Sequence, residues 1–459
     1  MKKNNKHNFD NSIFREYDIR GIVGKTLTVQ DSYFIGYNFA KQIKKKFNTL
    51  NIIVGYDGRL SSPILENNLI QGLYDCGACV TKIGLCSSPM LYFSSVKLKA
   101  DGAIMITGSH NPSDYNGFKI LSKEGSYYGK KIKSLSKKNN LKISKGSVDY
   151  YNIINSYIAK LVDTISFDSS KLKVVWDPGN GSSGIILKNL LKHIPGKHIL
   201  INGEVDGTFP SHHPDPTEEK NLKDIKKSIK KNNADIGIAF DGDCDRLGVL
   251  DSNGKLITGD KLLLLFALDL LKSNPSAKII ADVKASDNIF DEINKNGGCA
   301  IMSKTGHSLI KTKMKETNAL LAGEMSGHIF FADKYYGFDD ALYAAIRLLN
   351  ILSEGFSLNK FLNKFKNIHS TPEIKVFCKD NIKFKIMNRV KKIVSDKYDQ
   401  ISYLDGVRVT VSNGWWLIRA SNTQPALIVR CEANSKESLN NIINNLKVIL
   451  LDLGLKFNL

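Results

Sequence analysis

The sequence predicts an α/β protein made of several mixed-sheet units and completed by a smaller α+β unit. Three times, a short apolar stretch leads directly into a polar loop that contains glycine, near Ser109, Asp243 and Ser326. Alternation of apolar strand, polar loop and helix is typical of a parallel or mixed sheet. After about residue 370 the pattern changes to closely spaced apolar strands. A chain of 459 residues is too long for one core, so three or four domains are expected.

Composition narrows the class of protein. A hydrophobic content of 42% and a charged content of 24% are ordinary for a globular chain. No apolar run approaches the roughly 20 residues that cross a membrane, so we expect no membrane partner. The first seven residues are basic but no apolar segment follows them, which argues against a secretory signal. We expect residues 1–12 to form a flexible tail.

Cysteine usage and charge leave two alternatives to weigh. The seven cysteines are odd in number and mostly scattered, which favours reduced thiols and a cytoplasmic location. Cys76 and Cys79 have CxxC spacing, but a second pair at zinc-ribbon spacing is missing, which argues against a metal or redox role.

The net charge of +20 raises the possibility of a nucleic-acid binder. Because the lysines are spread out and not interleaved with aromatic residues, we favour a solvated surface that attracts anionic small substrates and expect no nucleic acid.

In the first unit, residues 51–55 and 103–106 are expected strands, and the second of them enters the loop TGSHNP at residues 107–112. Such a loop lies at the carboxyl end of a strand, where open α/β sheets place their chemistry. Ser109 at its tip, beside His110, could be a nucleophile or a phosphate carrier. A simple hydrogen-bonded turn is the alternative.

Three further residues of the first unit could serve this loop. Tyr17 and Arg20 flank a glycine turn and could reach a phosphate. Lys119 could return to the Ser109 loop as a charge partner, although a surface lysine is the simpler explanation. A P-loop is excluded, because its first glycine would stand where the chain has Ile19.

In the second unit, a strand at residues 234–240 runs into the loop DGDCDR at residues 241–246. Asp241, Asp243 and Asp245 alternate, so their carboxylates can converge on one hard cation. A calcium EF-hand would need glycine and glutamate where Arg246 and Ser252 stand. So few ligands leave room for a phosphate oxygen, which suits Mg²⁺. An acidic turn is the alternative, but like charges this close repel one another without a cation.

The third unit begins with an apolar helix at residues 262–271. Lys284 follows a strand and His307 follows Gly306, and either side chain could serve in acid–base chemistry. A strand at residues 318–322 leads into the loop GEMSGH at residues 323–328.

The last unit reads as an antiparallel sheet with strands at residues 409–411, 415–419 and 426–430 and a covering helix at residues 435–453. Arg419 lies between two of these strands. Together with Ser421, Asn422 and Thr423 it could form a phosphate clamp. A polar hairpin is the alternative. The expected domains are residues 13–148, 149–256, 257–368 and 369–459.

The four loops together resemble the signature loops of the α-D-phosphohexomutases, in order and over essentially the whole chain. The form GEMSGH is similar to the bacterial phosphomannomutase/phosphoglucomutase branch. The resemblance implies three similar mixed-sheet α/β domains and a smaller C-terminal α+β domain around a central cleft. It also implies that Ser109 is a phosphoserine and a metal ligand, and that Glu324, Ser326 and His328 face the sugar.

The implied reaction is reversible phosphoryl transfer between the 1- and 6-positions of a hexose phosphate, mannose or glucose. It passes through a hexose 1,6-bisphosphate, with one Mg²⁺ at the aspartates and with Arg246 adding charge. We expect a monomer or weak dimer. Phosphoglucosamine mutase is the alternative within the family, and it generally carries glutamine where Met325 stands. A serine hydrolase is disfavoured because the G-x-S-x-G pattern is missing.

Overall fold

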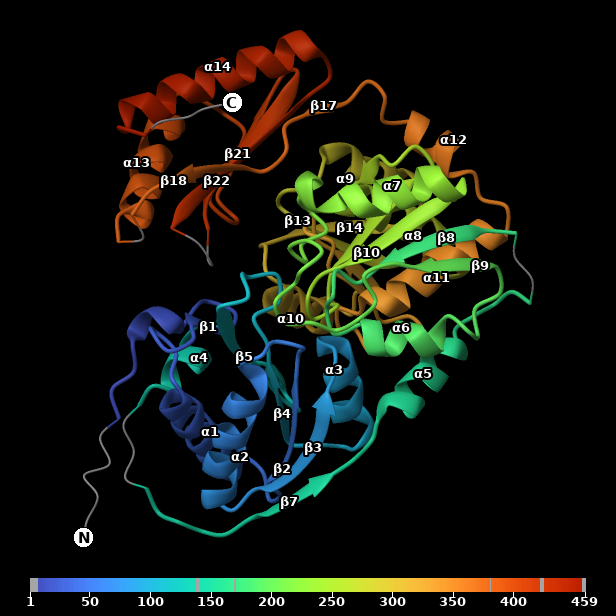
Figure 1. Ribbon diagram of the computed structural model, residues 1–459. Coiled ribbons are helices and arrows are strands. Elements are labelled where there is room, and N and C mark those ends of the chain that lie inside the picture. Colours follow the sequence, from blue (N-terminus) through green and yellow to red (C-terminus); the bar gives the residue numbers. More distant parts are fainter. Residues whose placement is uncertain (1–6, 138–140, 169–170, 380, 422–424, 456–459) are drawn as a thin grey trace.

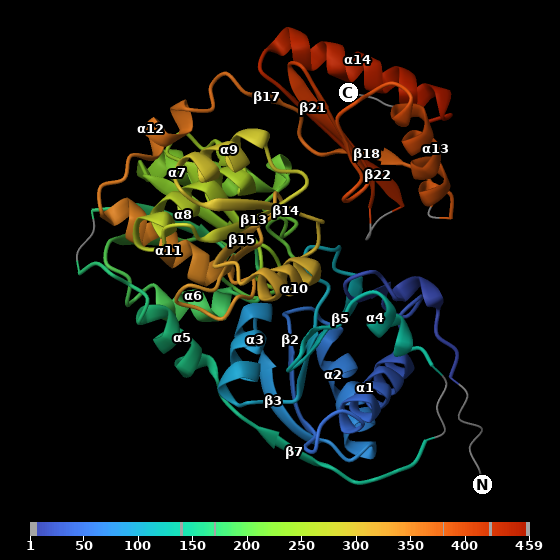
Figure 2. The ribbon, with the colours of Figure 1, turned by 180° about the vertical axis from the view of Figure 1, so that it is seen from behind.

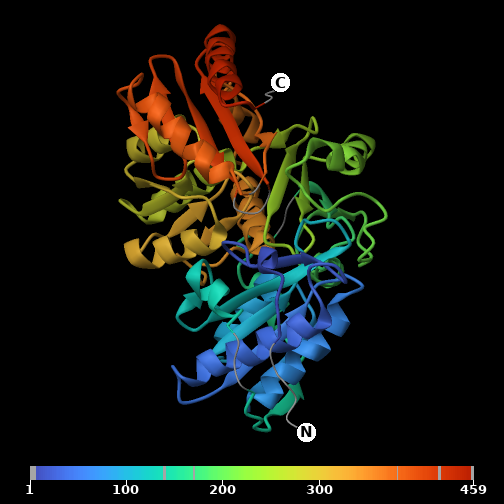
Figure 3. The same cartoon turned by 90° about the vertical axis from the view of Figure 1, so that its left-hand side faces the viewer.

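Four sheets with their helices follow one another along the chain in the computed structural model (Figure 1). The structure describes residues 7–137, 141–168, 171–379, 381–421 and 425–455. Seen from behind, the sheets of the second and third domains lie together, with the first and last domains on either side of them (Figure 2). Figure 3 shows the C-terminal domain in red and the first domain in blue at opposite ends of the molecule.

Domain 1 is built on a seven-stranded mixed sheet with the order β1-β5-β4-β2-β3-β7, in which β6 pairs with β5. Its strands are β1 (Ile19–Ile22), β2 (Asn51–Tyr56), β3 (Cys79–Leu85), β4 (Gly102–Ile106), β5 (Tyr115–Ser122), β6 (Gly125–Ser126) and β7 (Ser147–Tyr150). Its helices are α1 (Val29–Lys44), α2 (Ser62–Asp75), α3 (Ser88–Lys97) and α4 (Lys130–Ser134). The central strand β4 is buried throughout, so the loop that follows it begins deep inside the molecule.

Alternate residues of β4 face different cores, because successive side chains of a strand point to opposite faces. Ile104 and Ile106 pack with the residues of α1 and α2. Ala103 and Met105 join α3 in a larger core that continues through the second and third domains. One face of the first sheet therefore shares a hydrophobic core with the second and third domains.

Domain 2 has a five-stranded sheet with the order β12-β11-β10-β8-β9. Its elements are α5 (Ile154–Val162), β8 (Lys173–Asp177), α6 (Gly184–Leu190), β9 (Lys197–Leu200), α7 (Lys223–Asn232), β10 (Ile236–Phe240), β11 (Leu247–Asp251) and β12 (Leu256–Ile257). Strand β8 is parallel to β9 and β10, whereas β11 is antiparallel to β10. The loop between β10 and β11 holds the three alternating aspartates.

Domain 3 has a four-stranded sheet with the order β14-β13-β15-β16. Its elements are α8 (Gly259–Ser273), β13 (Lys278–Asp282), α9 (Asp287–Lys295), β14 (Cys299–Ser303), α10 (His307–Thr317), β15 (Leu321–Gly323), β16 (Ile329–Phe331), α11 (Ala341–Ser353) and α12 (Leu358–Asn363). In domains 2 and 3 alike, a parallel strand ends in a site loop and the chain returns as an antiparallel strand.

The C-terminal domain is an antiparallel sheet with the order β17-β22-β21-β20-β19, in which β18 pairs with β22. Its elements are β17 (His369–Ser370), β18 (Ile374–Phe377), α13 (Lys383–Ser395), β19 (Ile401–Ser402), β20 (Val407–Val411), β21 (Gly414–Ala420), β22 (Ala426–Ala433) and α14 (Lys436–Asp452). Trp416 and Ile418 of β21 pack under the two helices. Trp415 and Leu417 point the other way and pack with Val283 of domain 3.

The observed architecture confirms the predicted fold class, three mixed α/β sheets followed by an antiparallel sheet with helices. Two local features differ from the expected domain limits. Residues 7–12, expected to belong to a flexible tail, lie against α1, where His7 stacks on Phe34 and lies 2.6 Å from Asp31. Strand β7 crosses the limit expected at residue 148 and pairs with β3. Within the described part of the chain, no helix combines the length and apolar character needed to cross a membrane.

Candidate active site

Ser109 lies three residues after β4, in a backbone conformation that is rare for residues other than glycine. Its φ is +48°, and its side chain is buried. Its Oγ lies 2.9 Å from Oδ2 of Asp241 in domain 2 and 3.2 Å from Nδ1 of His110. Strained backbone of this kind persists only where the surroundings enforce it, and it is common at functional sites. The predicted loop therefore meets the acidic loop directly.

Arg59 enforces the conformation of the Ser109 loop. Its guanidinium donates to the carbonyl oxygens of Ser109 and Asn111, each at 2.7 Å, to that of Tyr115 at 2.9 Å, and to that of Pro112. Its Nε donates to Oδ2 of Asp57 over 3.2 Å. The sequence analysis did not assign Arg59 a role. The available signal was its position three residues after the end of β2, in another loop that follows a strand.

The three aspartates of the β10–β11 loop converge as predicted for a cation site. Asp241, Asp243 and Asp245 are completely buried, and each offers an oxygen within 4.8 Å of the others. Among the described residues, Oδ1 of Asp243 and Oδ1 of Asp245 have no hydrogen-bond partner. Buried carboxylate oxygens without donors are costly unless a cation binds them. Oxygen-only ligands of this kind suit Mg²⁺, so the residues fit that ion.

Charge around the aspartates is balanced by Lys119. Its ammonium pairs with both Asp243 and Asp245, which lie in another domain. Burial opposes the charge on each partner, but the attraction dominates: the pKa of Lys119 is raised well above its usual value and that of Asp243 is lowered. For Asp241, burial and the neighbouring Asp245 and Asp243 charges raise the pKa. Ser88, at the start of α3, donates to Asp243 over 2.5 Å and also ties domain 1 to this loop.

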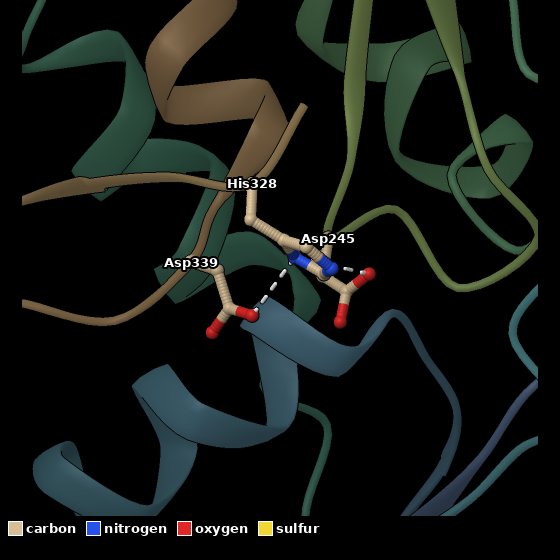
Figure 4. A group of neighbouring side chains, drawn as sticks. All are labelled: Asp245, His328 and Asp339. Atoms are coloured by element: carbon tan, nitrogen blue, oxygen red, sulfur yellow. Dashed lines mark ion pairs between the residues drawn. The ribbon is translucent and has the colours of Figure 1, made fainter. Parts of the chain in front are cut away.

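His328 joins the acidic loop to a second buried carboxylate (Figure 4). Its Nδ1 lies 3.1 Å from Oδ2 of Asp339 and 3.7 Å from Oδ1 of Asp245. Arg246 donates from Nε to the opposite ring nitrogen, Nε2, over 3.1 Å. Because Nε2 accepts that bond, the ring proton stands on Nδ1, facing the carboxylates. Asp339 was not singled out from the sequence, where it reads only as a residue before a helix.

His307 lies beside His328, with the two rings stacked at 5.5 Å. Its Nδ1 is 3.5 Å from Asp339. Burial and the nearby Lys311 ammonium lower the pKa of His307, so the ring is neutral near pH 7. Burial together with the Arg246 and Arg20 charges likewise lowers the pKa of His110.

Lys284 has a different environment from the one expected of an acid–base group. Its ammonium lies 2.6 Å from Glu373 and 3.5 Å from Asp282. Burial acts to lower the pKa of Lys284, but these carboxylates outweigh it and raise the pKa. The side chain is therefore held as a cation, which argues against its expected acid–base role. Glu373 had no signal in the sequence, since it lies in the segment between β17 and β18.

The sugar loop and the first-unit residues reach the same region. Glu324 is buried and accepts a hydrogen bond from the Gly306 backbone over 2.7 Å, while Ser326 is partly exposed. The Tyr17 hydroxyl donates to the Thr305 carbonyl over 2.6 Å, which links domain 1 to domain 3. Arg20 donates to Asp18 over 2.7 Å and also to Asn111 of the Ser109 loop.

Arg419 lies at the end of β21, on the edge of the C-terminal domain that faces domain 3. Its Nε donates to Asp405 over 3.0 Å, and Asp405 also accepts from the Thr305 backbone. Only 5% of Arg419 is exposed, and its Nη2 has no hydrogen-bond partner in the described part of the chain. Ser421 is buried beside it. The other two expected clamp residues, Asn422 and Thr423, lie outside the described residues.

The whole chain matches known proteins domain by domain. Residues 11–140, 155–254 and 258–368 match phosphoglucomutase/phosphomannomutase alpha/beta/alpha domains I, II and III. Residues 373–447 match the C-terminal domain of the same family.

Individual relatives cover nearly the full chain. A phosphomannomutase/phosphoglucomutase of Pseudomonas syringae is 45% identical over 454 residues, which are 97% of each chain. A phosphoglucomutase of Neisseria meningitidis serogroup A is 42% identical and covers 96% of this chain and 97% of its own. The crystal structure of a phosphoglucomutase/phosphomannomutase family protein from Burkholderia thailandensis superposes with a TM-score of 0.91 at 38% identity, covering 98% of this chain and 100% of that one.

Proposed function

Because the chain belongs to the phosphoglucomutase/phosphomannomutase family, we propose that it moves a phosphoryl group between the 1- and 6-positions of a hexose phosphate by way of phosphorylated Ser109. The chain is thus a phosphohexomutase, an isomerase. The observation that carries the proposal is the 2.9 Å contact between Ser109 Oγ and Asp241. It brings a strained serine from one domain onto the acidic loop of another.

The aspartates and the residues around them supply the charge that this transfer needs. Asp241, Asp243 and Asp245, with the Ser109 phosphate, would hold Mg²⁺, which neutralises charge on the transferring group. Lys119 and Arg246 add fixed positive charge beside the same loop. Such preorganised charge is most effective where water is excluded, as in this buried site.

The acceptor hydroxyl of the sugar must lose a proton as it attacks the phosphoryl group. We assign this proton to His328, because its ring lies against Asp245 of the acidic loop and Asp339 lies 3.1 Å from its Nδ1. Arg246 would have to leave Nε2 as the sugar hydroxyl arrives. His307, neutral and sharing Asp339, stands behind it as a second acceptor. Lys284 serves as a cation rather than a base.

The reaction also requires the sugar to turn over, so that each of its two phosphates meets Ser109 in turn. Glu324 can accept hydrogen bonds from two neighbouring sugar hydroxyls, with Ser326 helping to hold the ring. Arg419 and Ser421, with Tyr17 and Arg20 across the gap, would hold the phosphate that does not react. The hexose 1,6-bisphosphate is the intermediate of this sequence.

Substitution of Ser109 by alanine tests the proposal directly. The purified wild-type chain should carry one phosphoryl group, located by mass spectrometry in the peptide that contains residues 107–112. Ser109→Ala should lack it and lose turnover while keeping the thermal unfolding curve of the wild type. Full activity in Ser109→Ala would overturn the assignment.

Substrate choice distinguishes the main proposal from phosphoglucosamine mutase. Glucose and mannose differ only at C2. Hydrogen bonds from Glu324 to O3 and O4 would therefore not distinguish the two sugars. Comparable kcat/KM values for glucose 1-phosphate and mannose 1-phosphate are expected, with a much lower value for glucosamine 1-phosphate. The reverse order would favour the alternative, which the methionine at position 325 argues against.

A further inference from the structure

A second cavity, separate from the active site, opens between domain 1 and domain 3. Its volume is about 760 Å³. Its walls come from α3 and the β4–β6 strands on one side and from α10 and the segment after β16 on the other. Both ribbon views place α10 against the end of domain 1 that carries α3 (Figures 1 and 2). We call this cavity the interdomain groove.

We propose that the interdomain groove binds an aromatic anion of nucleotide size, such as a nucleoside diphosphate. Binding there would affect the active site through Lys311. The cavity is large enough, since pockets for small organic ligands span about 300–1,000 Å³. None of Ser109, the three aspartates or Arg419 lines it. Neither the fold nor the proposed reaction gives this groove a task.

Aromatic side chains form one wall of the groove. Tyr336 is 44% exposed there, although it stacks on Phe338 with ring centres 5.8 Å apart and planes 13° from parallel. Buried Tyr92 of α3, from domain 1, packs against Phe338 in the same wall, with ring centres 5.5 Å apart. Tyr336 is partly exposed and is supported by its stacking on Phe338, so it is suited to stack against a planar ring of a ligand.

Positive charge gathers at the rim of the same groove. Its lining includes Lys99, Lys123, Lys311 and Lys315, against a single carboxylate, Glu124. That carboxylate is already paired with Lys46. Lys99 and Lys315 are exposed and lie within 4 Å of no carboxylate oxygen among the described residues, although the Lys315 charge acts on Glu124 and helps to lower its pKa. Two unpaired ammonium groups beside an aromatic wall match a phosphorylated aromatic molecule.

Backbone strain marks one of these lysines independently. Lys99, after the end of α3, has a φ of +50°, a conformation that favours glycine or asparagine. A lysine there is less favourable than either residue, so the position is a strained one at the groove. A role in binding an anion at the groove would account for a lysine at such a position.

Lys311 connects the groove to the chemistry. Its ammonium lies 4.4 Å from the centre of the Tyr92 ring, in the groove wall, and 2.8 Å from Oδ1 of Asp339. Oδ2 of the same Asp339 contacts His328. An anion in the groove that attracts Lys311 would weaken its hold on Asp339, and so disturb the carboxylate that orients the proposed base.

Calorimetric titration of the whole chain with ADP, at fixed free Mg²⁺, tests the binding. We expect one site per chain, which saturating glucose 1,6-bisphosphate does not displace. Tyr336→Ala and Lys315→Glu should each weaken ADP binding about tenfold, with basal turnover unchanged. Lys447→Glu, an exposed lysine on α14, is the matched charge control and should bind ADP like the wild type.

Three results would overturn the binding proposal: no saturable ADP binding at millimolar concentration, displacement of ADP by the bisphosphate, or equal binding of ADP and inorganic phosphate. These readouts do not depend on the proposed function. The coupling does, and it is tested by kinetics: ADP should change kcat at saturating hexose phosphate, and Lys311→Gln should abolish the change. ADP binding without an effect on kcat would overturn the coupling alone.

Discussion

Asp339 shows how one buried side chain can organise several others. Its two oxygens contact Lys311, His307 and His328. None of these residues is adjacent to Asp339 in the sequence, and folding brings them together. A carboxylate that fixes the ring orientation of a histidine acts through that histidine rather than on substrate. Asp339 is therefore a positioning residue in the proposed mechanism.

Replacing Asp339 by asparagine should lower kcat about tenfold to a hundredfold and change KM little. The carboxylate acts to raise the pKa of His307, the second proton acceptor of the proposal, so its loss should also move the part of the acidic limb of the kcat profile that His307 sets to lower pH. Steady-state kinetics from pH 5.5 to 9 measure both effects. Asp333→Asn, which removes a carboxylate paired with Arg347 in the same domain, is the control and should leave the profile in place. An unchanged kcat in Asp339→Asn would remove it from the mechanism.

At the scale of elements, the strand-end loops are held by side chains from neighbouring strands. Arg59, after β2, binds four carbonyl oxygens of the loop after β4. Glycine is needed on the other side, because a methyl group on Gly242 would stand 2.6 Å from the Ser109 carbonyl oxygen. The two site loops thus meet backbone to backbone.

Arg59→Lys should loosen the Ser109 loop, since one ammonium cannot serve four carbonyl groups in the fixed geometry of a guanidinium. Each buried carbonyl left without a donor costs about 1–3 kcal/mol. We expect a lower unfolding temperature and a drop in kcat on the order of a hundredfold, because small misplacements of reacting groups are costly. Differential scanning calorimetry and turnover assays measure these. Arg389→Lys, on the exposed face of α13, should do neither.

The β8–β9 pair contains a pH-sensitive contact remote from the site. Trp176 donates from its indole to Nδ1 of His198 over 3.0 Å, and Nε2 of His198 lies 3.0 Å from the Ile194 carbonyl. Both ring nitrogens are thus used by the neutral form. Burial lowers the pKa of His198 below its usual 6.5.

A histidine with a lowered pKa binds its proton less readily in the folded than in the unfolded chain. Its contribution to stability is therefore complete above pH of about 6.5 and is lost as the pH falls through the folded value. We expect the free energy of unfolding in urea to decrease from pH 7 to pH 5. His198→Asn can keep both hydrogen bonds without titrating, so it should flatten this slope. The same slope in His198→Asn would place the sensitivity elsewhere.

At the scale of the whole molecule, the C-terminal domain contacts domain 3 through both polar and apolar side chains. Lys284 holds Glu373 in the segment that connects it, and Trp415 packs on domain 3 while Arg408 covers that indole at 3.9 Å. Arg419 stands at the same interface with one nitrogen unpartnered among the described residues. A phosphate would complete its bonding and draw the domain inward.

Arg419→Ala should raise KM for the hexose phosphate about tenfold to a hundredfold, because a charge-assisted contact is worth about 1.5–3 kcal/mol. kcat should change much less. Small-angle X-ray scattering should show a smaller radius of gyration for the wild type when substrate is added, and no such change in Arg419→Ala. Arg389→Ala is the control for loss of an arginine in the same domain. An unaltered KM in Arg419→Ala would refute the clamp.

The sequence by itself determined the fold class and the position of every site loop, for a local reason. Apolar strands that end in glycine-bearing polar loops can be recognised without knowing what packs against them. Ser109 and the three aspartates could therefore be named as candidates from the sequence, and the resemblance to the phosphohexomutases implied their roles. The match to four phosphoglucomutase/phosphomannomutase domains confirms the family that those loops indicated.

Only the tertiary structure decided which charges meet. Lys119 reaches Asp243 across 124 positions, Lys284 finds Glu373 across 89, and Asp339 gathers two histidines and a lysine from other elements. No local pattern encodes such pairs, because burial and the proximity of opposite charges arise only when segments far apart in the sequence pack together. Those same contacts decide that Lys284 stays a cation, that His307 is neutral, and that the proposed base is oriented by a carboxylate whose sequence neighbours give no sign of it.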